Sequence, residues 1–213
     1  MNNNQSINYT DKIMEKKLDF SEVLTQGIGV GLKNLPSMIA AVVLWLVTIW
    51  IPYLNVGTTI AISTLPIELS KGKVISPLMI FDKKYYKYMG EYFLLAAFMY
   101  VAILIAMAFL VIPGIVVSIA WSMAVLLLLD KGFNPTQAIS ESNKITYGHK
   151  WTIFFVYFVL IVVMAVLTYI FGLIPYIGGV LNVIVLICFM VAMLGCQGVI
   201  YGKLSAGIPH QHE

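Results

Sequence analysis

The stretch that decides the fold is Trp151–Gly202, which reads WTIFFVYFVLIVVMAVLTYIFGLIPYIGGVLNVIVLICFMVAMLGCQGVIYG. It contains no charged residue, and its single proline, Pro175, lies near the middle. A helix that crosses a bilayer needs about 20 consecutive apolar residues. The stretch is therefore long enough for two such helices that reverse direction at the proline, and it predicts a membrane hairpin.

Two further uncharged blocks, Asn34–Ile67 and Tyr92–Leu129, repeat this pattern. Their central prolines are Pro52 and Pro113. The three blocks together predict an all-α fold: an integral membrane helical bundle of about six transmembrane segments arranged as three hairpins, with short amphipathic helices at the membrane surface. The expected hairpins cover about 34–69, 92–129 and 151–203.

The lengths of the six segments leave two arrangements open. The segments are Pro36–Ile51, Val56–Leu69, Tyr92–Ile112, Ile115–Leu129, Trp151–Leu173 and Ile177–Lys203. The third, fifth and sixth reach the length of a full span, whereas the first, second and fourth are short. Either the short helices extend into their polar flanks, with lysines reaching the interface, or the first hairpin is re-entrant or tilted within the bilayer.

Charge is sparse and segregated along the chain. Only 11% of the residues are charged, compared with about 25% in soluble domains, and 60% are hydrophobic. All 13 basic residues are lysines, and they fall in the termini and in the connections between hairpins, on one side of the predicted membrane. The positive-inside rule then predicts that this charged side, with both termini, faces the cytoplasm. A net charge of +3 without a basic stripe predicts no nucleic-acid partner.

The polar segments define the expected domain organisation. Residues 1–33 form a cytoplasmic N-terminal segment with an amphipathic helix over Asp11–Lys33, residues 34–205 form the transmembrane domain, and residues 206–213 form a flexible C-terminal tail. Two short interfacial elements are expected between hairpins. One covers Ser76–Tyr88, and the other covers Asn134–Tyr147, where Asn134 can cap the helix and Pro135 suits its first position.

A group of lysines next to tyrosines marks the first of these elements. Lys83, Lys84 and Lys87 are candidates for contact with the headgroups of anionic lipids, because clustered cations beside a membrane attract them. The same pattern also serves simply to anchor a helix and to set its orientation.

No arrangement of residues typical of catalysis appears in the sequence. The histidines His149, His210 and His212 lack neighbouring ligands at metal spacing, and Gly27, Gly29 and Gly31 form a G-x-G-x-G pattern without a preceding strand. No Asp, Glu, Lys, Arg or His lies inside the three blocks, which argues against an ion-coupled transporter. We therefore predict no enzymatic activity, no cofactor and no metal.

Milder polar side chains do lie within the predicted spans. Asn55, Thr58, Thr59, Asn182 and Gln197 are the best candidates for a polar core that contacts a headgroup or a small solute. The alternative is that these amides and hydroxyls form hydrogen bonds between helices, each contributing about 0.6–2 kcal/mol. Small residues four apart, such as Gly57/Ala61 and Gly198/Gly202, indicate close helix packing within one chain, within a homo-oligomer or with a membrane-protein partner.

Several short motifs occur in a characteristic order between about residues 27 and 205: Asn55-Val56-Gly57, Ile112-Pro113-Gly114-Ile115, Asp130-Lys131-Gly132, Ala138-x-x-x-Ser142, Gly148-His149-Lys150-Trp151, Ile177-Gly178-Gly179 and Tyr201. In these motifs the chain resembles a bacterial superfamily of polytopic membrane domains, found fused to some glycerophosphodiester phosphodiesterases and also as stand-alone proteins. The resemblance implies a six-helix fold in the bacterial plasma (inner) membrane. It implies no catalysis, because the acidic metal ligands of the soluble phosphodiesterase domain have no counterpart here.

The functional expectation is a non-enzymatic multi-pass inner-membrane protein that binds or organises membrane lipids or partner proteins. The alternative expectation is a channel or facilitator for a small or apolar solute, with the polar core residues lining its path.

Overall fold

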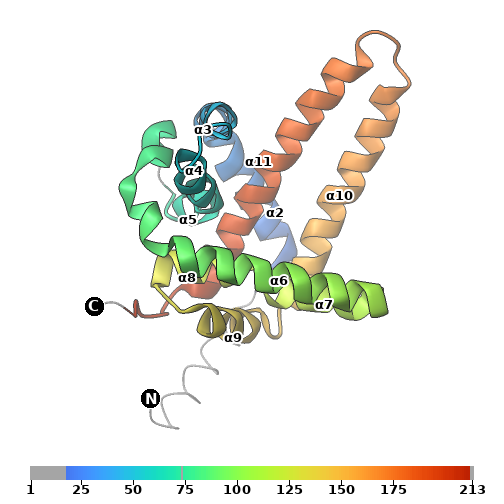
Figure 1. Cartoon of the computed structure of the whole chain (residues 1–213). Coiled ribbons are helices and arrows are strands. Elements are labelled where there is room, and N and C mark those ends of the chain that lie inside the picture. The colour runs from blue at the N-terminus through green and yellow to red at the C-terminus, as the bar shows by residue number, and fades with distance from the viewer. Residues whose placement is uncertain (1–17, 73, 212–213) are drawn as a thin grey trace.

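The computed structural model describes residues 18–72 and 74–211, and within these ranges every regular element is a helix (Figure 1). The α-helices are α2 (Phe20–Lys33), α3 (Leu35–Thr48), α4 (Leu54–Ser63), α5 (Leu65–Ser70), α6 (Met89–Phe109), α7 (Val111–Ala120), α8 (Ala124–Lys131), α9 (Pro135–Thr146), α10 (Lys150–Gly172) and α11 (Gly178–Ser205). Two 3-10 helices, η1 (Pro77–Phe81) and η2 (Lys83–Tyr88), precede α6. The predicted all-α class is confirmed.

Within the described ranges, four helical stretches are long and apolar enough to cross a membrane: Lys83–Phe109, Val111–Lys131, Lys150–Gly172 and Gly178–Ser205. A fifth is reached only if α2 and α3, which meet at a bend of 67°, are taken as one broken span. The molecule is thus a helical membrane protein with four or five candidate spans. The expected six depends on the first hairpin, where α3 has 14 residues and α4 only 10.

The first and third hairpins turn through the same unusual backbone conformation. Tyr53 and Tyr176 both follow a proline, and both adopt a positive φ, at 71° and 67°. In each case the carbonyl of the proline accepts a hydrogen bond, at 2.9 Å, from the amide two residues later, Leu54 or Ile177. This is the rare γ-turn with positive φ, which a bulky side chain adopts only under strain. The prolines therefore mark these two reversals as predicted.

The second hairpin differs from the predicted one in two places. The chain reverses at Leu110, so that Pro113 lies in the first turn of α7 instead of in the connection. The predicted segment Ile115–Leu129 is also broken at Trp121–Met123, between α7 and α8. Proline is tolerated in a first helical turn because its missing N–H would have no partner there.

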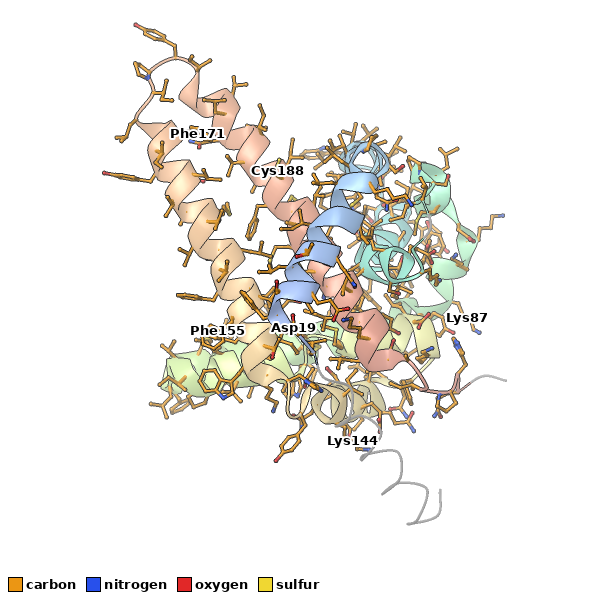
Figure 2. The ribbon with its side chains drawn as sticks, turned by 180° about the vertical axis from the view of Figure 1, so that it is seen from behind. Asp19, Lys87, Lys144, Phe155, Phe171 and Cys188 are labelled. Carbon is orange, nitrogen blue, oxygen red and sulfur yellow. The ribbon has the colours of Figure 1, made fainter. Side chains whose placement is uncertain are left out.

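The α6–α7 and α10–α11 hairpins meet in one buried region, the base of the molecule, and run from it in different directions. One buried cluster joins side chains of α2, α8, α9, α10 and α11, among them Val23, Leu127, Ala138, Val156 and Tyr201. From this base the α10–α11 hairpin rises to one end of the molecule, whereas the α6–α7 hairpin runs across the lower part (Figure 1). The opposite view shows Asp19 and Lys144 near the base and Phe171 at the far end (Figure 2).

The N-terminal and C-terminal segments pack more closely on the rest of the protein than their polar sequences predict. The part of the expected Asp11–Lys33 helix before residue 18 lies outside the described residues, and the rest, α2, begins with Asp19 as its N-cap and packs along α11. In the segment expected as a flexible tail, Ile208 is buried and the amide of Gln211 donates to the carbonyl of Lys131 at 2.9 Å.

Candidate functional site

Three of the predicted polar core residues lie together on α4 and bond to α3. The hydroxyls of Thr48 and Thr58 are 3.0 Å apart, and the indole N–H of Trp45 donates to Thr59 Oγ1 at 3.0 Å. The amide of Asn55 donates to the carbonyl of Ile49 at 3.2 Å, across the turn. These contacts hold the two short helices of the first hairpin together.

The other two predicted residues lie far apart on α11. Asn182 and Gln197 are separated by 15 positions, which is about 22 Å along a helix. Gln197 Nε2 donates to the carbonyl of Ser122 at 3.4 Å, and Asn182 Oδ1 is buried without a hydrogen-bond partner among the described residues. The five polar residues therefore occupy three separate places instead of one cavity.

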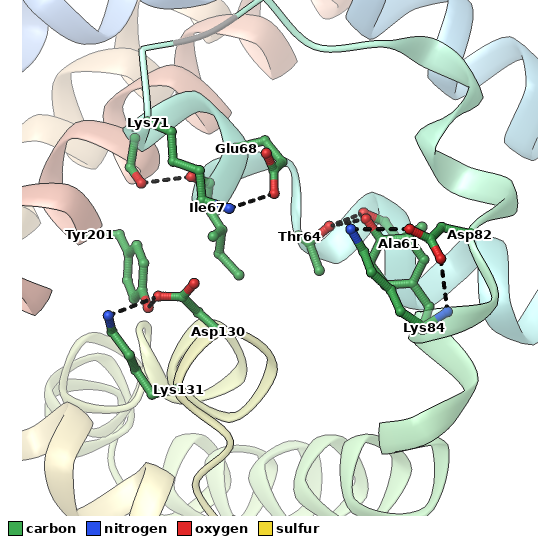
Figure 3. A network of polar contacts seen from close by, with 12 residues as sticks. Ala61, Thr64, Ile67, Glu68, Lys71, Asp82, Lys84, Asp130, Lys131 and Tyr201 are labelled. Carbon is green, nitrogen blue, oxygen red and sulfur yellow. Dashed lines mark hydrogen bonds and ion pairs between the residues drawn. The ribbon is translucent and has the colours of Figure 1, made fainter. Parts of the chain in front are cut away.

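The predicted lysine cluster lies on η2, exposed at the surface. Lys84 Nζ is 3.3 Å from Asp82 Oδ2 and 5.0 Å from the ring centre of Tyr85, and Lys87 Nζ lies 5.2 Å from the ring centre of Tyr88 (Figure 3 shows the Asp82–Lys84 contact). The backbone N–H of Lys84 donates to Asp82 Oδ1 at 3.0 Å and lowers the pKa of that carboxyl below its usual value. Within the described ranges, no carboxylate pairs with Lys83 or Lys87.

Buried hydrogen bonds that the sequence did not reveal stabilise the break between α7 and α8. Ser142 of α9 is fully buried, donates to the carbonyl of Ala120 at 2.7 Å and accepts from the amide of Met123 at 3.1 Å. Together with the bond from Gln197 to Ser122, these contacts satisfy backbone groups that the helix break leaves without partners. The only sequence signal was the position of Ser142 on the inner face of its helix.

A second polar cluster ties α11 to the end of α8. The Tyr201 hydroxyl donates to Asp130 Oδ2 at 2.6 Å, and Lys131 Nζ is 3.4 Å from the same oxygen (Figure 3). Glu68 and Lys71 form an ion pair at 2.8 Å within and just after α5. In the described part of the chain, no three His, Cys, Asp or Glu side chains are grouped closely enough to hold a metal ion.

Glycines bring α2 and α11 into direct contact. A Cβ on Gly27 would lie 2.6 Å from Cys196 Cα, and a Cβ on Gly31 would lie 2.7 Å from the carbonyl oxygen of Val191. Gly29, between them, faces open space. The G-x-G-x-G pattern thus serves helix packing, through the small-x-x-x-small spacing of Gly27 and Gly31.

Among the described residues, an apolar groove lies on each of two sides of α11. The larger, the α2–α10–α11 groove, has a volume of about 290 Å³. Its lining residues are Ile28, Leu32, Leu160, Val163, Met164, Leu167, Ile184, Val185, Cys188, Phe189, Val191 and Ala192. The smaller, the α3–α11 groove, has a volume of about 200 Å³ and is lined by Met38, Ile39, Val42, Val43, Leu46, Ile187, Met190, Val191 and Leu194.

The arrangement of the larger groove follows from the glycine contact. Because α2 lies against α11 near Gly27 and Gly31, its side chains Ile28 and Leu32 form one wall, while α10 forms the opposite wall. None of the five predicted polar residues lines either groove. The sequence missed the grooves because their lining residues look like any others on an apolar helix.

Comparison with protein-family models, curated proteins and solved structures gave no match.

Proposed function

We propose that this protein is a non-enzymatic multi-pass membrane protein that binds lipid acyl chains along α11. The observation that supports this most strongly is the α2–α10–α11 groove, which is lined by apolar side chains and formed in part by two helices of membrane-spanning length. In a bilayer such a groove faces hydrocarbon and not water.

The size and chemistry of the groove suit a slender flexible chain. Its volume of about 290 Å³ lies just below the roughly 300–1,000 Å³ typical of ligand pockets. Met164 and Phe189 offer adaptable and polarisable surface, and no charged side chain is among the lining residues. Within a membrane, binding of this kind depends on close van der Waals contact, because lipid tails are as apolar as the protein.

The exposed lysines provide a second, electrostatic contact with lipid. Lys83, Lys84 and Lys87 lie on η2, directly before the apolar helix α6, where a headgroup would be within reach. Each lysine near an anionic surface contributes about 1 kcal/mol. In this proposal the lysines recognise anionic headgroups, and the pairing of Lys84 with Asp82 makes Lys83 and Lys87 the stronger contacts.

The sidedness of the lysines supports a topology with both termini in the cytoplasm, by the positive-inside rule. A bacterial inner-membrane location rests on the resemblance carried by the sequence motifs. Membership of the superfamily of phosphodiesterase-linked membrane domains is likewise our proposal. It rests on the motifs, two of which meet in space where Tyr201 bonds to Asp130.

The facilitator alternative lacks a comparable observation. The hydroxyls of Thr58 and Thr59, which would line its path, are used to join α4 to α3. The exposed apolar helix faces are also compatible with self-association or with a membrane-protein partner. No feature on those faces, however, selects one partner.

A pair of matched variants tests acyl-chain binding. Cys188→Phe fills the α2–α10–α11 groove, whereas Val183→Phe places the same ring on an exposed face of α11 that does not line it. Each protein is reconstituted with phosphatidylethanolamine and phosphatidylglycerol, and the lipid retained after mild detergent extraction is measured by native mass spectrometry. We expect Cys188→Phe to weaken lipid binding by about tenfold, equivalent to about 1.4 kcal/mol, and Val183→Phe to bind like the unaltered protein. Equal retention by all three proteins, or no retained lipid at all, would contradict the proposal.

A further inference from the structure

The α6–α7 hairpin lies across the direction of the α10–α11 hairpin. In Figure 1 it runs along the lower part of the molecule, while α10 and α11 rise to the other end. The reverse view shows the same arrangement (Figure 2). The α6–α7 hairpin packs against α8, α9 and the α10 helix. The turn between α6 and α7 therefore stays near the base, whereas the turn at Pro175 lies at the far end.

Beyond Glu91 in the first turn of α6, the α6–α7 hairpin carries no charge on any side. No charged residue occurs between Tyr92 and Leu129, and only 6% of the most apolar window of Lys83–Phe109 is buried in the molecule. The exposed fraction reaches 83% at Phe109 and 76% at Ile112, at the turn. Helices that lie at the membrane–water interface have a distinct polar face, so this hairpin belongs in hydrocarbon.

In this arrangement, helix α9 lies at the membrane–water interface. Its outer side carries the ion pair between Glu141 and Lys144, and Lys150, just after it, donates to Asn143 at 3.0 Å. Its inner side, with Ala138 and Ser142, is buried. Trp151 is 74% exposed at the start of α10, shortly after α9. Tryptophan at such a position is typical of the membrane–water interface.

Helix packing distances then fix the depth of the hairpin. Helices in contact have axes about 8–10 Å apart, so α6 and α7 lie about that far inside α9. Half of a bilayer's hydrocarbon core is about 15 Å thick. A hairpin at this depth that runs across the α10–α11 direction remains within the half of the bilayer next to α9.

We infer that the α6–α7 hairpin is inserted into the leaflet on the α9 side and does not cross the bilayer, with the acyl chains of that leaflet covering its exposed faces. The inference is independent of the groove beside α11. It assigns the hairpin an activity of its own: by occupying area in one leaflet only, it favours membranes that are convex on the α9 side, as other one-sided insertions do.

Thiol labelling tests this placement. In the full chain with Cys188→Ser and Cys196→Ala, single cysteines replace Ile112, Tyr147 or Tyr176 in oriented membrane vesicles. A membrane-impermeant maleimide is applied to each side in turn. We expect the cysteine at position 147 to react from one side only and the cysteine at position 176 from the other side only. The cysteine at position 112 should react from neither side until detergent is added.

A second measurement tests what covers the hairpin. A polarity-sensitive fluorophore on the cysteine at position 112, or at position 109 if the first variant does not accumulate, is exposed to lipids brominated at defined acyl positions. Stronger quenching by bromines in the outer half of the chain than by bromines at its end supports the inference. Labelling of position 112 from the same side as position 176, or a disulfide between two copies through position 112, would overturn it.

Discussion

Ser142 illustrates how one side chain can connect three helices. Its hydroxyl bridges the carbonyl of Ala120 and the amide of Met123, and the break between α7 and α8 depends on both contacts. Ala138, Ser142 and Ile145 recur at helical spacing along α9, and all three are buried. The partners of Ser142 were not predictable, because neither glycine nor proline marks the break at Trp121–Met123.

Removing this hydroxyl should be costly. Ser142→Ala leaves the buried amide of Met123 without its partner, and such a group costs about 1–3 kcal/mol. The carbonyl of Ala120 loses its shorter hydrogen bond but keeps one from Thr146 Oγ1 at 3.4 Å. Ser140→Ala, on the exposed side of the same helix, is the matched control. We expect the free energy of unfolding, measured in mild detergent, to fall by about 1–3 kcal/mol for Ser142→Ala and to stay nearly unchanged for Ser140→Ala. Equal effects of the two substitutions would show that the hydrogen bonds of Ser142 contribute nothing to the free energy of unfolding.

At the scale of helices, the long uncharged stretches were predicted well and the short ones were not. The predicted segments Trp151–Leu173 and Ile177–Lys203 agree with α10 and α11 to within one or two residues. The α9 helix starts at Pro135 with a full capping box from Asn134, as its sequence indicates. The segment Val56–Leu69, in contrast, divides at Thr64 into α4 and α5, two residues before Pro66. Hydropathy detects length but not such breaks.

The packing of α2 on α11 provides a direct test at this scale. Gly27→Ala places a methyl group 2.6 Å from Cys196 Cα and forces the helices apart, whereas Gly29→Ala points into open space. Overpacking of this kind costs about 1–3 kcal/mol, while alanine in an exposed helical position gains up to about 1 kcal/mol over glycine. Thermal unfolding in detergent should therefore show opposite shifts. A stabilising or neutral Gly27→Ala would show that α2 does not approach α11 as described.

At the scale of the whole molecule, the direction of each hairpin could not be read from sequence. A helix that is apolar on all sides has no stripe to indicate which face meets a neighbour. The relative orientation of α6–α7 and α10–α11 depends instead on the contacts at the base, such as Tyr201 with Asp130. For the same reason the five polar residues could be recognised individually but not assigned to their three separate places.

The segregation of charge is the claim on which the membrane account rests. A membrane-impermeant amine-acylating reagent, applied to the unaltered protein in intact spheroplasts and in inside-out vesicles, reports the side of each lysine by peptide mass spectrometry. We expect lysines from all connections, including Lys71, Lys87 and Lys144, to be modified in inside-out vesicles and protected in spheroplasts. Modification of lysines in different connections from opposite sides of the membrane would contradict the account.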